Sequence, residues 1–301
     1  MHAERRASKF GLVVLCVVAM WAPSESARAW CQMTSSNRTG RPGDPCILAN
    51  PPETFPLAWR RRCTSLSLSS MGSHDLSSNQ VREIFEASIS AWENVLCDGA
   101  PTGLSAFVSS DINACTNANH FTNDRNVHAI IFVPSGWSTE RMHDPRAYAV
   151  TLVWHDRRSG EIWDVDMEIN EQRGPYTVCP PSGCSPGVVD LQNVVTHEMG
   201  HYFGLAHTPD DRLATMWGSA EPNETFKRDL QPDDIEGICA VYAPGTLPEA
   251  CDPTPRGGLN LECTRRGNCD CSVPGMNRAP GINMFLFSAL FLVGWLARRR
   301  V

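Results

Sequence analysis

The longest periodic stretch of the chain is residues 77–96, where apolar side chains recur at intervals of three and four positions. The apolar set is Val81, Ile84, Phe85, Ile89, Trp92, Val95 and Leu96. This spacing puts them on one face of an α-helix, and Ser78 is a suitable N-cap residue. We therefore expect a long amphipathic helix that packs against a sheet.

Strand patterns lie on both sides of this helix. Residues 64–70 alternate apolar and polar side chains, and residues 129–133 form a continuous apolar run. Residues 147–155 and 161–170 are two further strand candidates, and the turn residues 157–160 separate them. Strands that alternate with a helix predict an α/β arrangement in layers.

The strand expected at residues 161–170 has two different faces, because side chains alternate along a strand. The apolar face consists of Trp163, Val165, Met167 and Ile169, and the polar face of Asp164, Asp166, Glu168 and Asn170. Calcium prefers oxygen ligands, so Asp164, Asp166 and Glu168 could bind this ion. A solvated polar face is the alternative.

The N-terminus predicts export. Basic residues precede an apolar run at residues 10–21, and the small-residue triplet 27–29 follows it. This is the order of a secretory signal peptide, which we assign to residues 1–29. Export lets cysteines pair as disulfides. Of the 13 cysteines, Cys16 lies in the signal, and Cys31–Cys46 and Cys179–Cys184 are candidate local pairs.

The C-terminal part of the chain has a different composition. Residues 244–281 are rich in cysteine, proline and glycine, which is typical of a linker, and the apolar run 284–297 precedes three arginines. Basic residues after an apolar segment favour a cytoplasmic C-terminus. The layout also resembles the myxobacterial C-terminal sorting signals, so residues 282–301 are either a membrane anchor or a sorting segment. The formal net charge of −7 gives no reason to expect a nucleic acid partner.

One short segment carries a complete set of metal-binding groups. Residues 197–207 read HEMGHYFGLAH, on a helix that Asp190 can cap. His197 and His201 are four residues apart, so their imidazoles lie on one helical face and can reach one zinc ion. Gly204 can take the left-handed conformation that ends a helix, which lets the chain bring His207 to the same metal. Three nitrogen ligands with one open position are typical of a catalytic zinc site.

Glu198 is the candidate general base. It follows the first ligand but points off the ligand face, toward the expected position of the water that the zinc activates. A carboxylate there can accept the proton of this water. The sequence therefore predicts hydrolysis, because a structural zinc site needs ligands but no base.

The histidine segment resembles the HExxHxxGxxH motif of the metzincins, and within them the chain is similar to the matrixin peptidases. Residues 214–217 stand where metzincins have the Met-turn, and residues 230–242 are similar to the matrixin closing helix. The resemblance covers the catalytic domain expected at residues 59–243. Residues 30–58, which precede it, are expected to form a separate N-terminal segment that contains cysteine.

The resemblance implies an α/β (α+β) metzincin-like fold. It has a twisted, mainly parallel sheet with an antiparallel edge strand, a long packing helix, an active-site helix and a C-terminal helix. Residues 161–170 would be the edge strand that faces the substrate, and Met216 would underlie the zinc.

The chain also departs from the matrixin pattern. Arg62 and Cys63 keep only two letters of the PRCGxPD cysteine switch, so Cys63 is expected in a disulfide instead. Thr208 stands where matrixins usually have serine. No histidine-rich loop for a second, structural zinc is recognisable, and His155 and Asp156 are the nearest candidates.

These observations lead to one main hypothesis, a secreted or surface-attached zinc metalloendopeptidase that acts on protein or peptide substrates. The alternative from another class is a catalytically inactive surface binding protein with a structural zinc. A membrane-bound processing protease is a third hypothesis, which differs from the first in the tail and not in the site.

Overall fold

The computed structural model describes residues 30–36 and 54–265. The predicted signal peptide, Cys46 and the predicted tail at 282–301 lie outside the described residues. Among the residues that are described, no helix has the length and apolar character needed to cross a membrane.

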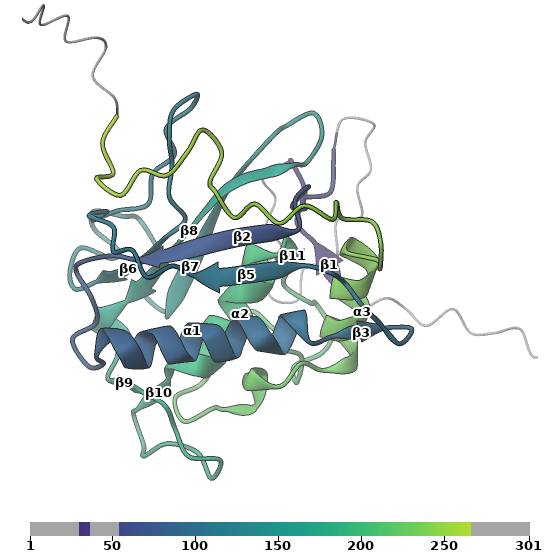
Figure 1. Ribbon diagram of the computed structural model, residues 1–301. Helices are drawn as coiled ribbons and strands as arrows, with labels where there is room; N and C mark the ends of the chain where they lie inside the picture. The colour runs from purple at the N-terminus through teal and green to yellow at the C-terminus, as the bar shows by residue number, and fades with distance from the viewer. Residues whose placement is uncertain (1–29, 37–53, 266–301) are drawn as a thin grey trace, which may run out of the picture. The chain divides into compact units, whose positions relative to one another are not determined.

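A five-stranded sheet forms the centre of the domain (Figure 1). Its strand order is β5 (Ser105–Val108), β2 (Cys63–Leu68), β6 (Ala129–Val133), β8 (Ile162–Asn170) and β7 (Ala149–His155). Neighbouring strands are parallel except β7, which pairs antiparallel with β8 at the edge of the sheet. The expected mainly parallel sheet with an antiparallel edge strand is therefore confirmed.

The identity of the edge strand differs from the expectation. The resemblance places residues 161–170 at the edge, but β8 has β6 on one side and β7 on the other. The cause is the turn at residues 156–161, which folds β7 back along the outer side of β8. The antiparallel edge strand is thus β7, and β5 lies at the opposite edge of the sheet.

Two helices pack against each other beneath the sheet in the view of Figure 1. The long helix α1 (Ser78–Glu93) buries Phe85 and Trp92, and its N-cap is Ser77, in a capping box with Gln80, and not Ser78 as expected. Helix α2 (Leu191–Tyr202) begins at the expected N-cap, Asp190. The Trp92 indole N–H donates to the Thr196 carbonyl at 2.9 Å, which ties the two helices together.

The closing helix is α3 (Pro232–Val241), which begins with proline at its first turn. The other described elements are short: β1 (Cys31–Gln32), β3 (Leu96–Cys97), β4 (Ala100–Pro101), β9 (Tyr176–Thr177), β10 (Val189–Asp190), β11 (Leu205–Ala206), η1 (Glu171–Arg173) and η2 (Phe226–Arg228).

The two faces of the sheet have different covers. The main core contains Ile130, Phe132 and Met167 together with the helices. The opposite face carries a smaller core around Ile131 and Trp137, against which Leu259 packs. One side of the sheet is therefore helical and the other is covered by loops and the segment 244–265.

Disulfides attach this segment to the domain. The described residues contain Cys63–Cys251, Cys97–Cys239, Cys115–Cys263 and Cys179–Cys184. The pair Cys179–Cys184 and a disulfide at Cys63 agree with the expectations from sequence. Cys31 is disulfide-bonded as well, but the predicted partner Cys46 lies outside the described residues. Two of these bonds hold residues 244–265, the first part of the predicted linker, against the domain.

Candidate metal centre

The end of α2 and the chain that follows it set the positions of three histidines. His197 and His201 lie one turn apart on α2. Gly204 follows the helix with φ of 92°, and a Cβ there would lie 2.5 Å from the Leu57 carbonyl oxygen, so only glycine suits this turn. The chain then enters β11, which pairs with β1, and His207 comes directly after it.

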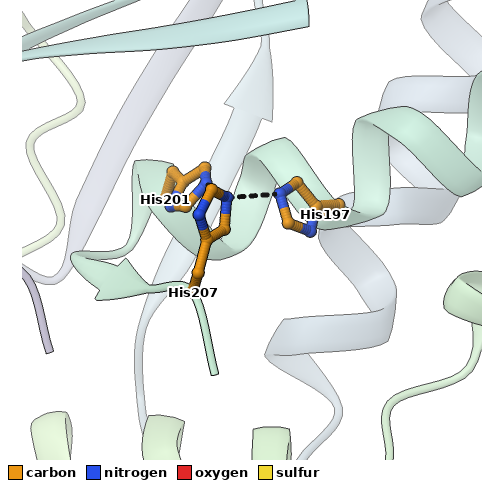
Figure 2. A group of neighbouring side chains, drawn as sticks. All are labelled: His197, His201 and His207. Atoms are coloured by element: carbon orange, nitrogen blue, oxygen red, sulfur yellow. Dashed lines mark hydrogen bonds between the residues drawn. The ribbon is translucent and has the colours of Figure 1, made fainter. Parts of the chain in front are cut away.

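The three imidazoles point toward one another (Figure 2). The Nε2 atom of His207 lies 3.3 Å from Nε2 of His197 and 3.1 Å from Nε2 of His201. Two nitrogens bound to one tetrahedral zinc at about 2.0–2.1 Å are roughly 3.3 Å apart. The donor spacing therefore fits a zinc ion.

Hydrogen bonds also select the tautomer that binds a metal. Nδ1 of His197 contacts the Thr215 carbonyl oxygen at 2.6 Å, and Nδ1 of His201 contacts that of Leu205 at 2.8 Å. A carbonyl oxygen only accepts, so each Nδ1 carries the hydrogen and each Nε2 keeps its lone pair. Burial lowers the pKa of both rings, and the neighbouring histidines lower that of His197 further. Both imidazoles are thus neutral near pH 7, the form that ligates zinc.

The Met216 side chain packs against α2 at Gly200, which lies between His197 and His201. A Cβ on Gly200 would come within 2.1 Å of the Met216 sulfur, so glycine is needed for this contact. The turn itself is held by Asp234, whose carboxylate accepts from the amides of Thr215 at 2.8 Å and Met216 at 2.9 Å. Helix α3 thereby supports the residue that orients His197.

Glu198 follows His197 on α2 and is buried, with 5% of its surface exposed. Its Oε2 accepts a hydrogen bond of 2.5 Å from the Thr151 hydroxyl on β7. Burial raises the pKa of Glu198 to about 7, although the Thr151 hydrogen bond and the charge of Lys227 oppose this shift. A carboxyl group with this pKa can both accept and release a proton near neutral pH.

Comparison with known families identifies the domain. The family model described as Matrixin, of the peptidase M10 group, matches residues 58–243. The chain belongs to the matrixin family. This membership supports a zinc-dependent metalloprotease and agrees with the resemblance noted in the sequence.

Shorter stretches of this matrixin match individual relatives. It is 36% identical over 86 residues to Metalloendoproteinase 1-MMP of Arabidopsis thaliana, which is 29% of this chain and 20% of that relative. It is 47% identical over 53 residues to Metalloendoproteinase 1 of Glycine max, 18% and 17% of the two chains. It is 40% identical over 74 residues to interstitial collagenase of Bos taurus, 21% and 15%. The matched stretches cover no more than 20% of these relatives.

The acidic face of β8 in this matrixin is not solvated. Asp164, Asp166 and Glu168 are exposed by 0%, 1% and 2%, so the expectation of a wet face is wrong. Periodicity along the strand does not reveal that loops cover this face of the sheet.

Each of the three carboxylates already accepts hydrogen bonds. Asp164 contacts Nδ1 of His128 at 2.6 Å and Nδ1 of His120 at 2.9 Å. Asp166 accepts from the amides of Ala129 and Asn119, and Glu168 from the Ala118 amide, Arg141 and His143. These donors occupy the oxygens that calcium would need, and calcium binding stays a prediction.

Two residues near the site were not assigned from the sequence. Asp234 could have been noticed, because it lies in the first turn of α3, the closing helix that the matrixin resemblance predicted. Thr151 carries no such signal, since its contact with Glu198 joins a strand to a helix 47 residues away. His155 and Asp156, the weak candidates for a second zinc, belong to no group of three or more metal-binding side chains in the described part of the chain.

Proposed function

We propose that this chain is a zinc-dependent metalloendopeptidase that hydrolyses peptide bonds in proteins or peptides. His197, His201 and His207 are the zinc ligands and Glu198 is the general base. The observation that carries this proposal is the convergence of three Nε2 atoms at α2, the helix that also carries the buried carboxylate of Glu198 directly after His197. A metal-binding site and a proton acceptor thus lie next to each other.

Zinc bound by three histidines acts as a Lewis acid and makes water a nucleophile near neutral pH. Glu198 accepts the proton that the attacking water loses when its oxygen bonds to the scissile carbonyl carbon. The same carboxyl then returns this proton to the departing amine nitrogen when the C–N bond breaks. The raised pKa of Glu198 suits both transfers.

Strand β7 is the proposed docking edge for the substrate. Among the described strands it pairs only with β8, so its outer edge is open to an extended peptide. Peptides bind such edges through main-chain hydrogen bonds, which do not depend on one particular sequence. Since Thr151 of β7 contacts Glu198, a peptide on this edge would lie beside the base.

We also propose that the protein works outside the cytoplasm. The disulfides among the described residues form and persist in oxidising compartments. The predicted signal peptide agrees with export, and attachment to a membrane or cell surface through residues 282–301 stays a prediction.

The alternative, an inactive binding protein with a structural zinc, is less well supported. Burying a carboxylate costs free energy, and a structural zinc site gains nothing from an adjacent carboxylate that is not a ligand. The test is whether the purified protein degrades casein, loses this activity with 1,10-phenanthroline and regains it with added zinc. Zinc-loaded protein without peptidase activity toward casein or a peptide library would favour the binding protein.

A further inference from the structure

We infer that Thr151 is a positioning residue for Glu198, so that the strand that aligns the substrate also orients the base. The inference rests on the proposed function, because it gives Thr151 a role only if Glu198 is the base. It adds to that function a residue from a different element of the fold.

The register of the sheet brings the Thr151 side chain to the site. Thr151 lies opposite Met167 in the β7–β8 ladder, and Met167 belongs to the helix-covered core. Residues directly opposite in an antiparallel pair project to the same face of the sheet. The Thr151 hydroxyl therefore points toward α2, where it meets Glu198 Oε2 at 2.5 Å.

The side chains of Thr151 and Glu198 differ in conformational freedom. Threonine is branched at Cβ and has restricted χ1 rotation, and Thr151 is held in a strand. Glutamate has three rotatable side-chain bonds and loses much entropy when it is fixed in one conformation. The stiff strand residue therefore determines where the carboxylate of the flexible one lies.

Among the described residues, Thr151 is the one that donates a hydrogen bond to the Glu198 carboxylate. It engages Oε2 and leaves the second oxygen for the proton of the attacking water. A hydroxyl can also accept a hydrogen bond, so the contact can persist after Glu198 takes up the proton. Holding a base in its working geometry contributes to the rate and not to substrate affinity.

The test uses two substitutions at this position. Thr151→Val keeps the shape and removes the hydroxyl, and we expect kcat to fall about ten- to hundredfold, the effect of a lost hydrogen bond to a charged group. KM and bound zinc should change by less than about twofold, because Thr151 is proposed to contact neither the substrate side chains nor the metal, so ground-state binding is not altered. Thr151→Ser keeps the hydroxyl and should retain kcat within a few-fold.

Controls separate this role from a general loss of structure. Thr102→Val removes another buried threonine hydroxyl, one that accepts from the Leu104 amide, and should leave kcat unchanged. If Thr151 acts through Glu198, adding Thr151→Val to Glu198→Gln should cause no further loss of the residual activity. Thr151→Ala must repeat the loss of kcat, and it replaces the valine variant if that variant does not fold.

Several results would overturn the inference. Wild-type kcat in Thr151→Val or Thr151→Ala, or an equal loss in the Glu198→Gln background, would show that Thr151 does not position the base. If Glu198→Gln is nevertheless inactive, Glu198 is still required for catalysis, and the proposed function is retained without the role for Thr151. A wild-type protein without peptidase activity would instead remove the proposed function and this inference together.

Discussion

The domain contains two sets of buried carboxylates, and they differ in how their oxygens are used. On the loop-covered face of the sheet, Asp164, Asp166 and Glu168 accept hydrogen bonds from histidine, arginine and backbone donors. On the helix-covered face, Glu198 accepts a hydrogen bond from Thr151 and follows His197, one of the three convergent histidines, on α2. The first set is satisfied within the protein, whereas in the described part of the chain only one oxygen of the Glu198 carboxylate accepts a hydrogen bond.

A raised pKa does not distinguish the two sets. Burial, followed by the charge of Asp164, raises the pKa of Asp166 well above its usual value, and burial raises that of Glu198 to about 7. Perturbed pKa values also arise in structural networks of buried charges. A carboxylate with few donors that follows a metal-ligand candidate on the same helix is therefore the better indicator of a functional group.

The largest expected effect comes from removing a proposed ligand. His207→Ala leaves two histidines, which are too few for a catalytic zinc site, so bound zinc and peptidase activity should both fall to background. Elemental analysis and casein hydrolysis measure the two quantities. The matched control is His74→Ala on the surface, which should keep both. Full zinc occupancy in the His207→Ala protein would exclude His207 from the site.

A substitution on the acidic face of β8 should lower the free energy of unfolding and leave kcat unchanged. Asp164→Asn places an NH₂ group against one of two histidine nitrogens, and we expect the free energy of unfolding to fall by about 2–4 kcal/mol. Urea unfolding measures this loss, and kcat of the folded protein should stay within about twofold. Asp144→Asn, at the exposed pair with Arg146, is the control and should not alter unfolding measurably. A large loss of kcat at unchanged stability would break the contrast between the two sets.

The effect of Glu198 on the stability of the metal-free protein should depend on pH. Its folded pKa of about 7 is above the ordinary value of 4.5, so the protonated carboxyl is favoured in the folded state. Its contribution to stability is therefore complete below about pH 4.5 and is lost as pH rises through 7. Relative to wild type, Glu198→Gln should gain at most about 3 kcal/mol at pH 8 and nothing near pH 4. Urea unfolding of EDTA-treated proteins at both pH values tests this, and a gain independent of pH would contradict it.

Local patterns predicted much of the fold. The periodicity of residues 77–96 corresponds to α1. The Asp190 cap and the turn at Gly204 depend only on neighbouring residues, and both are present. The same locality brings His197, His201 and His207 together, since all three lie within one segment of eleven residues.

Features that depend on distant segments could not be predicted in this way. The order of strands is not encoded in the alternation along any one strand, so the expectation put β8 at the edge that β7 occupies. The cover over Asp164 comes from loops without periodicity, which contribute His120 and His128. The partner of Cys63 lies 188 residues away, and no local pattern indicates Cys251.

The most direct test of the account is Glu198→Gln, which preserves the size of the side chain but removes its ability to accept a proton. Because Glu198 is proposed as base and not as ligand, the purified variant should keep its zinc. Its kcat for a peptide substrate should fall by at least about 10²–10⁴-fold, with KM much less affected. Near wild-type turnover in the zinc-loaded variant would contradict the proposed mechanism, and loss of zinc would mean that Glu198 has a different role.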